Sequence, residues 1–297
     1  MTPRPCPQTA LTGARTDLPV LLPVRQPQAR PGGEVWLPRL TAWHGAVLVA
    51  LLALSVVAAE AQQTAAAAPE MLSIPATLLK WTPLLLQGFA LNIAMSFLAM
   101  ALGTVAGTFL GIAQVSLLRS VRRGAWFLTQ FFRNAPWLVL LFYVMLLVPF
   151  EVQLAGTTVP LPDWAKATFG FSLPVMANVS EIVRGAILSV PATQWESAEA
   201  LAFSRRQILW SIILPQCVKR MLPPWMNLYA ILTMATVLAS VVGVNEALTL
   251  TGDALAAEDR GILLVPMYLW ILSWFFLYCY PIARLTIHLE RRFMVQL

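Results

Sequence analysis

Long apolar segments separated by short charged ones constrain the fold of this chain more than any other feature. They are 84–118, 126–150, 173–189, 222–243 and 263–285. Each is long enough to cross the roughly 30 Å hydrocarbon core of a bilayer as a helix. Only 11% of the residues are charged, whereas about a quarter are charged in an ordinary soluble domain. Because lipid offers the backbone no hydrogen-bond partner, these segments must be helical. The sequence therefore predicts an all-α, polytopic bundle of transmembrane helices.

The N-terminal part does not fit this core. Residues 1–42 are rich in arginine and proline and lack apolar periodicity, which is typical of a disordered, cytoplasmic leader. The apolar run 46–59 has two interpretations. It is a retained anchor helix, which the long leader favours, or a cleaved signal peptide, which Ala59-Glu60-Ala61 favours. The expected organisation is a leader (1–42), an N-terminal apolar segment with an external linker (43–83) and a transmembrane domain (84–297).

Within the core, two local features are expected from the sequence. The helix 84–118 should break near Gly88, and 151–171 should be an external loop because it holds glycine, prolines and Asp163. Small residues recur in the first helix as Gly103, Gly107 and Gly111. This spacing allows close helix approach, either within the chain, which we favour, or in a dimer.

Basic residues set the orientation. Of the twenty lysines and arginines, fifteen fall in segments that we expect in the cytoplasm and only Lys80, Lys166 and Arg260 in segments that we expect on the opposite side of the membrane. Lysine and arginine accumulate on the cytoplasmic side of membrane proteins. The bias predicts a multi-pass protein of the inner (plasma) membrane, with 191–215 and the C-terminus in the cytoplasm, and the N-terminus too if 46–59 is retained. The segment 245–260 is expected outside, with a negative face from Glu246, Asp253, Glu258 and Asp259. Such a face can dock a partner protein, although acidic external loops are also common without partners.

Several function classes are excluded by what the sequence lacks. It contains no G-x-x-x-x-G-K-[ST] loop for nucleotide phosphates, no Cys/His metal-ligand spacing and no G-x-S-x-G. We therefore expect no catalytic residue, no metal site and no cofactor bound by this chain. The net charge of +6 is distributed by topology without forming a patch, so nucleic acid is not an expected partner, whereas membrane lipid is.

The charged stretch 191–215 interrupts the apolar segments. Thr193 and Glu196 have capping-box spacing, and Ser204 and Gln207 repeat it. The pattern predicts a short helix ending near Phe203, a turn, and a second helix ending before Pro215. Two short helices joined to membrane helices on both sides would form a stiff lever.

This stretch resembles a known motif. From Glu196 it reads Glu-Ser-Ala, three residues, Ala202, nine residues, then Ile-x-Leu-Pro, which is similar to the EAA loop (EAA-x3-G-x9-I-x-L-P) of permease subunits of ABC importers. The resemblance implies a coupling loop that docks onto a separate ATPase. The coupling residues that it implies are Glu196, Ser197, Ala198, Ala202, Phe203, Ile212, Leu214 and Pro215. Ala202 replaces the motif glycine, which costs about 1–2 kcal/mol if that residue is left-handed.

Two further stretches, FFRNAPWLV and SEIVRGAILSVP, resemble the polar amino-acid uptake class of these permeases. The resemblance implies a five-helix core, to which 46–59 adds one possible extra helix. It also implies a dimer with itself or a paralogous permease, an extracytoplasmic substrate-binding protein, and ATPase subunits that use ATP and Mg. The implied function is ATP-driven import of a polar amino acid or a similar small zwitterion by alternating access.

Polar residues within the expected spans have two interpretations. Glu181 and Arg184 share a helix face and can pair, with Arg133 as a further partner. Tyr229, Thr233, Thr236 and Ser240 also follow one face. We favour a structural role for both sets. The alternative is a translocation path, with candidates Asn178, Glu181, Thr233, Thr236 and Ser240.

A secondary transporter or channel driven by an ion gradient is the alternative function. Such a protein needs carboxylates within the membrane as ion sites, and Glu181 is the only obvious candidate.

Overall fold

The computed structural model describes residues 47, 50–58, 73–154 and 157–293. The chain divides into two compact units, Met1–Val47 and Leu48–Leu297, and the account below concerns the second. The predicted leader 1–42 lies outside the described residues. Residues 50–58 are helical, and Val56 packs against an apolar cluster that includes Leu85 and Met267. Both interpretations of 46–59 remain open.

The first long helix, α2, runs from Ile74 to Gln114. It begins well before Leu84, because Pro75 near its first turn supplies the fixed φ of a helix start. The predicted break near Gly88 is wrong, since α2 continues through it. A Cβ on Gly88 would lie 2.7 Å from the backbone nitrogen of Ala247. This glycine therefore allows close packing of the segment that begins at Ala247 and does not interrupt the helix.

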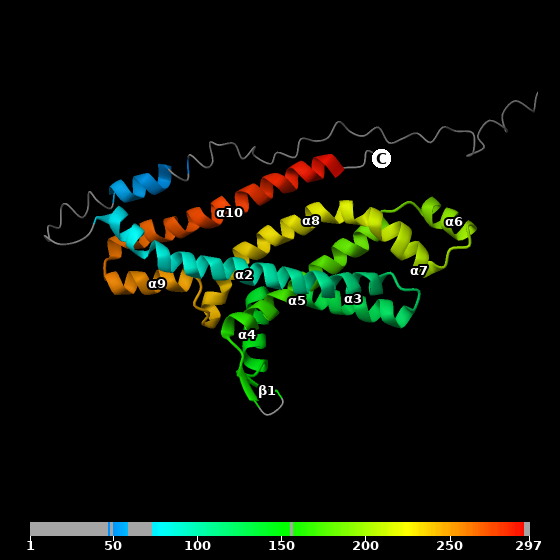
Figure 1. Cartoon of the computed structure of the whole chain (residues 1–297), viewed down its shortest axis with the longest axis horizontal. Helices are drawn as coiled ribbons and strands as arrows, with labels where there is room; N and C mark the ends of the chain where they lie inside the picture. The colour runs from blue at the N-terminus through cyan, green and yellow to red at the C-terminus, as the bar shows by residue number, and fades with distance from the viewer. Residues whose placement is uncertain (1–46, 48–49, 59–72, 155–156, 294–297) are drawn as a thin grey trace, which may run out of the picture. The chain divides into compact units, whose positions relative to one another are not determined.

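The next expected span is a broken pair of helices. Helices α3 (Arg119–Asn134) and α4 (Trp137–Leu147) are bent by 105° relative to each other. The break falls where Pro136 caps α4 in an extended conformation, because proline at this point cannot continue the first helix. Figure 1 shows α4 turning away from the direction of the longer helices.

The expected external loop 151–171 is more ordered than predicted. Strands β1 (Glu151–Leu154) and β2 (Thr157–Pro160) form an antiparallel hairpin in which Glu151 pairs with Pro160. Helix α5 then begins at Asp163 and ends at Leu188, so the last part of the expected loop is helical. Only residues 161–162 connect the hairpin to α5.

The remaining elements follow the coupling stretch. They are α6 (Ala192–Ala200), α7 (Arg205–Gln207), a π-helical segment (Ile208–Ile213), α8 (Leu214–Ala235), a 3-10 helix (Thr236–Val242), α9 (Ala247–Glu258), a 3-10 turn (Gly261–Leu263) and α10 (Leu264–Phe293). From Arg205 to Val242 the chain is one continuous helical span, and Gly243 ends it in the left-handed region with φ 88°. Helix α9 occupies most of the expected outer segment 245–260.

Helix α2 packs closely on α5 through its glycines. A Cβ on Gly107 would lie 2.6 Å from the carbonyl oxygen of Met176, and a Cβ on Gly111 would lie 2.7 Å from that of Ser180. Val179 and Val183 fill the same contact from α5. The glycine stripe therefore serves packing within the chain, as favoured from the sequence.

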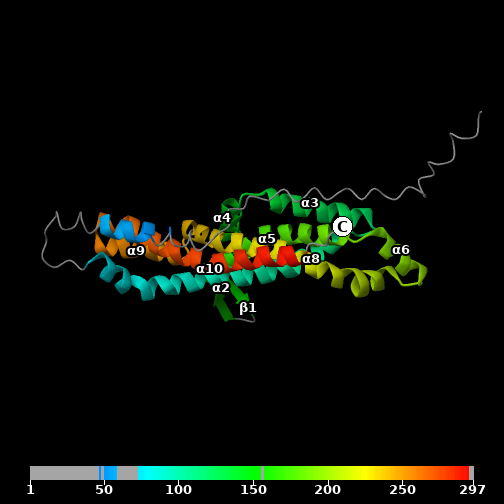
Figure 2. The same cartoon turned by 90° about the horizontal axis from the view of Figure 1, so that it is seen from above.

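The predicted fold class is confirmed. Among the described residues, four helices are long and apolar enough to cross a membrane, and the bent pair α3–α4 makes a fifth span if counted as one. Figures 1 and 2 both place α6 at the opposite end of this unit from α9. The coupling stretch and the outer helix α9 thus lie at opposite ends of the bundle.

Candidate functional site

The coupling loop begins at a proline and not at the predicted capping box. Pro191, with φ −54°, is the N-cap of α6, and no side chain caps this helix. The prediction for Thr193 and Glu196 is wrong because the helix starts one residue before Thr193, which places Thr193 inside it. The carbonyl of Thr193 instead accepts a hydrogen bond from Ser197 Oγ at 2.7 Å.

The second capping box is confirmed. The backbone N–H of Gln207 donates to Ser204 Oγ at 3.4 Å, and the backbone N–H of Ser204 donates to Gln207 Oε1 at 2.9 Å. Both exposed amides at this helix start are satisfied by the reciprocal pair. The predicted end of this helix before Pro215 is wrong, because the helix runs without interruption into the membrane span and Pro215 lies in the first turn of α8. Its direction is therefore fixed by α8.

The turn between the two helices requires a left-handed residue. Ala202 has φ 59°, and the N–H of Phe203 donates to the carbonyl of Ala198 at 3.2 Å. This is the hydrogen bond of a Schellman motif, which usually places glycine at the left-handed position. Ala202 therefore carries the expected strain of about 1–2 kcal/mol.

The motif residues divide between the bundle and the surface. Ala198 is buried against the neighbouring helical segment, and Ile212 and Leu214 are partly buried. In contrast, Glu196, Ser197, Ala202, Phe203 and Pro215 are exposed. Trp195 and Glu199 also hold α7 to α6, because Arg205 lies 4.2 Å from the Trp195 ring centre and 3.6 Å from the Glu199 carboxylate. The loop is thus anchored from within and presents Glu196 outward.

One contact that fixes the loop was missed in the sequence. Arg220 of α8 donates through Nη1 to the backbone carbonyl and the hydroxyl of Ser189, both at 2.6 Å. Ser189 directly follows α5. The two membrane helices that flank the loop are therefore joined where they leave the membrane.

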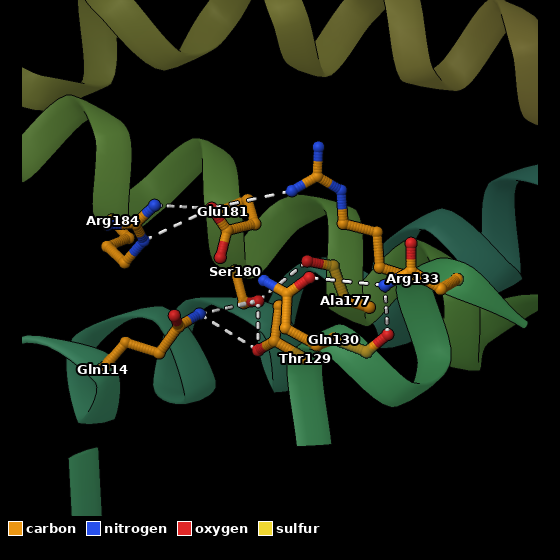
Figure 3. Close-up of polar contacts among 9 residues, drawn as sticks. Gln114, Thr129, Gln130, Arg133, Ala177, Ser180, Glu181 and Arg184 are labelled. Carbon is orange, nitrogen blue, oxygen red and sulfur yellow. Dashed lines mark hydrogen bonds and ion pairs between the residues drawn. The ribbon is translucent and has the colours of Figure 1, made fainter. Parts of the chain in front are cut away.

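A polar network lies where α2, α3 and α5 meet (Figure 3). The Glu181 carboxylate accepts a hydrogen bond from Arg184 at 2.8 Å and lies 3.8 Å from Arg133. The Glu181 side chain is 16% exposed, whereas those of Arg133 and Arg184 are 47% and 36% exposed. The structure thus brings together the three charged residues singled out in the sequence, with the carboxylate innermost.

A second layer supports this ion-pair group. Gln114 Nε2 donates to Thr129 Oγ1 at 3.0 Å and to Ser180 Oγ at 3.2 Å, and the two hydroxyls lie 2.9 Å apart. Gln114 and Thr129 were not singled out in the sequence, because isolated polar residues in separate helices carry no local signal. Their contacts depend on how the helices pack.

The other path candidates belong to different surroundings. Asn178 donates to the carbonyl of Pro174 at 2.8 Å, one turn earlier in α5. Thr233 and Thr236 are fully buried. Thr236 Oγ1 accepts from Asn92 Nδ2 at 3.0 Å and donates to the carbonyl of Thr233 at 2.7 Å. Ser240 donates to its own helix at the carbonyl of Val237. Thr236 thus joins its helix to α2, whereas Thr233 donates to the carbonyl of Tyr229 within its own helix.

Glu246 is a buried carboxyl and not part of an outer negative face. It is 0% exposed. Its Oε1 accepts the backbone N–H groups of Leu248 and Thr249 at 2.9 and 3.0 Å, and its Oε2 accepts Asn92 Nδ2 at 2.9 Å. It lies outside the membrane-spanning helices, and burial raises the pKa of its carboxyl while these hydrogen bonds lower it less. Glu246 caps α9 and ties it to α2.

Glu258 also has a partner within the chain. Lys80 Nζ and Trp81 Nε1 donate to its Oε1 at 2.6 and 2.8 Å. The hydrogen bond from Lys80, followed by that from Trp81, lowers the pKa of the Glu258 carboxyl. Of the four acidic residues expected on the outer face, Asp253 and Asp259 are therefore the exposed ones.

A comparison with protein families decides the identity. The family described as binding-protein-dependent transport system inner membrane component matches residues 99–293. This chain belongs to that family. It is the multi-pass, inner-membrane permease subunit of an ABC import system, as predicted. A separate ATPase subunit hydrolyses ATP, and the permease itself is not catalytic and binds no cofactor. The ion-gradient alternative does not fit this family.

Two curated relatives come from Bacillus subtilis (strain 168). The probable amino-acid ABC transporter permease protein YckA is 36% identical over 167 residues, which cover 56% of this permease and 71% of YckA. The L-cystine transport system permease protein TcyB is 30% identical over 210 residues, which cover 71% of this permease and 86% of TcyB.

A solved structure supports the fold. A crystal structure of an amino acid ABC transporter with histidines is similar with a TM-score of 0.63 and 22% sequence identity, covering 75% of this permease and 100% of that chain. The helical core of this permease therefore has the architecture of a solved ABC transporter chain.

Proposed function

We propose that this permease forms the translocation path for a polar amino acid or a similar small zwitterion, and that its coupling loop transmits the force of the ATPase. The observation that carries the proposal is the exposed Glu196 on a loop anchored at both ends. Relatives named for amino acids, including L-cystine in TcyB, support the substrate class.

The polar network suits a zwitterion. A carboxylate, Glu181, lies beside two guanidinium groups, those of Arg133 and Arg184. The Glu181 carboxylate attracts the ammonium group of a zwitterion, and the two guanidinium groups attract its carboxylate. A passing zwitterion would exchange these internal pairs for contacts of the same kind, so the network can serve structure in one state and the path in another.

Coupling follows from the geometry of the loop. Closure of the ATPase dimer moves α6 through Glu196. Because Arg220 joins the ends of α5 and α8, both helices move with the loop. The result is a change of access from one membrane side to the other.

Pairing with a second permease, either itself or a paralogue, is supported by α4. This helix turns 105° from α3 and exposes a row of large apolar side chains, among them Tyr143 at 60%, Leu146 at 81% and Leu147 at 77%. A second permease would cover this surface, and a binding protein would deliver substrate from the opposite side to α6.

The experiment is reconstitution of the permease with its ATPase and binding protein in proteoliposomes. We expect ATP-dependent uptake of one or a few labelled amino acids, and none in Glu196→Lys. Glu290→Lys is the matched control, because Glu290 is also an exposed glutamate on the cytoplasmic side. Wild-type uptake by Glu196→Lys would refute the coupling role, and uptake without ATP would refute the function.

A further inference from the structure

Two adjoining cavities lie beside the coupling loop. One, of about 690 Å³, is lined by the ends of α2 and α5, the start of α3, and residues of α6 and α7. The other has a volume of about 510 Å³. Both are lined by Val115, Ser116, Leu117, Trp195 and Arg205, so they are contiguous. Each volume lies in the range of about 300–1,000 Å³ that small-molecule sites occupy.

The two cavities together have an excess of positive charge. Arg122, Arg184 and Arg205 line the larger one together with the carboxylate of Glu196, and Arg206 lines the smaller one. Arg184 is held by Glu181, and Arg205 lies 3.6 Å from Glu199. Arg122 donates only to the carbonyl of Ser116, at 3.2 Å, and has no acidic partner among the residues that the structure describes. With Arg184 and Arg205 paired, Arg122 and Arg206 face the one carboxylate of Glu196, so the combined cavities favour an anionic group near Arg122.

Gln114 presents an unsatisfied acceptor at the same cavity. It is 4% exposed, and its Nε2 is engaged by Thr129 and Ser180. Its Oε1 is buried without a hydrogen-bond partner and points away from those hydroxyls (Figure 3). A buried acceptor left unpaired is unfavourable. A ligand that carries a hydroxyl or ammonium donor beside its anionic group would satisfy it.

The smaller cavity is mostly apolar. Besides Arg206, its further walls are Phe109, Ile112, Ala113, Val121, Leu209 and Trp210. Phe109 and Trp210 are 65% and 51% exposed. These side chains lie next to the cytoplasmic arginines that follow α2, at the edge of the membrane. A positively charged cavity that continues into an apolar groove matches an amphiphile better than a soluble anion.

We propose that the two cavities together bind one phospholipid of the cytoplasmic leaflet. Its phosphate contacts Arg122 and Arg205, a headgroup hydroxyl, as in phosphatidylglycerol, donates to Gln114 Oε1, and an acyl chain lies along Phe109 and Trp210. Basic pockets between transmembrane helices on this side of membranes bind such headgroups. The lipid contacts both the α2–α3 connection and the coupling loop, so its occupancy sets how firmly the loop is held.

The test uses the complete transporter, with permease, ATPase and binding protein. Phosphatidylglycerol retained through purification is measured by native mass spectrometry for the wild type, Arg122→Gln and Arg123→Gln. Arg123 is the matched control, because it is adjacent and exposed but lines neither cavity. We expect retention to fall about fivefold in Arg122→Gln and to be unchanged in Arg123→Gln. Equal retention in both variants, or equal loss, would overturn the proposal.

A second measurement needs no variant. The thermal midpoint of wild-type transporter in phosphatidylcholine nanodiscs should rise when phosphatidylglycerol is included, and should not respond to soluble glycerol 3-phosphate. A rise with glycerol 3-phosphate alone would identify a free-phosphate site. This result would contradict a lipid occupant, whatever the transported substrate proves to be.

Discussion

Arg220 and Ser189 join the two helices on either side of the coupling loop, with the guanidinium 2.6 Å from both the carbonyl and the hydroxyl oxygen of Ser189. The loop between them is therefore closed at its base. Its only direct continuations are α5 and α8, which carry any motion of the loop into the membrane.

Breaking this closure should uncouple ATP hydrolysis from transport. In Arg220→Gln the charge-assisted hydrogen bonds are lost, and α5 and α8 can move separately. We expect substrate transported per ATP hydrolysed to fall about fivefold, the factor that corresponds to about 1 kcal/mol. Paired uptake and phosphate-release assays measure the ratio. Lys219→Gln, one residue earlier and exposed, should keep the wild-type ratio, and an unchanged ratio in Arg220→Gln would argue against closure.

The contact of α2 with α5 leaves no room for a methyl group at Gly107. A Cβ there would lie 2.6 Å from the carbonyl oxygen of Met176, which is backbone and cannot move aside. Gly107→Ala should therefore destabilise the permease by about 1–3 kcal/mol. Gly124→Ala is the control, because nothing lies within 4 Å of its Cβ position. Thermal unfolding in detergent measures both, and equal midpoints would mean that the helices are not this close.

Ala202 should accept glycine with a gain in stability. Its φ of 59° is left-handed, and glycine removes the Cβ clash. Ala202→Gly should strengthen the end of α6 by about 1 kcal/mol. Ala200→Gly, at the last residue of α6, should instead weaken the helix, by at most about 0.5–1 kcal/mol. Hydrogen exchange of the amides of α6 distinguishes the two, since protection should rise in the first variant and fall in the second.

Glu246 should make stability depend on pH. Burial raises the pKa of its carboxyl in the folded state. The Glu246 carboxyl therefore contributes its full stabilisation of the fold below its unfolded pKa near 4.5, and this stabilisation is lost as pH rises through the folded pKa. In Glu246→Gln an amide NH₂ group must occupy one of two positions that now accept hydrogen bonds, which costs about 1–3 kcal/mol. The midpoint difference from wild type should be largest at low pH and shrink as pH rises.

Glu258 should make stability depend on pH in the opposite direction. Hydrogen bonds from Lys80 and Trp81 lower the pKa of its carboxyl. Its contribution is present above the unfolded value near 4.5 and is lost as pH falls through the folded pKa. Glu258→Gln should therefore differ from wild type at neutral pH and approach it in acid. The same pH dependence in both variants would contradict the assigned environments.

The features that could be predicted from the sequence are those that residues close together in the chain decide. The apolar runs identified the membrane helices, since lipid leaves the backbone no other structure. Ser204 and Gln207 form their capping box because both residues lie within one turn of the helix start. The Thr193–Glu196 box failed because Pro191, two residues earlier, starts α6 first.

Contacts between distant segments could not be predicted in the same way. Glu246 looks like a surface residue in the sequence, yet Asn92, far away in the chain, buries it with a hydrogen bond. Gln114, Thr129 and Ser180 come from three different helices. Gly88 looks like a helix break but is the contact point for Ala247. In each case the partner that decides the role is supplied by packing.

Cysteine cross-linking at position 196 tests the coupling role most directly. In the complete transporter, with Cys6, Cys217 and Cys279 replaced by alanine, Glu196→Cys should react only with reagents supplied from the cytoplasm and should cross-link to the ATPase subunit. Glu290→Cys should show the same sidedness without the cross-link. Labelling of position 196 from outside, or transport that continues with no cross-link to the ATPase, would contradict the account.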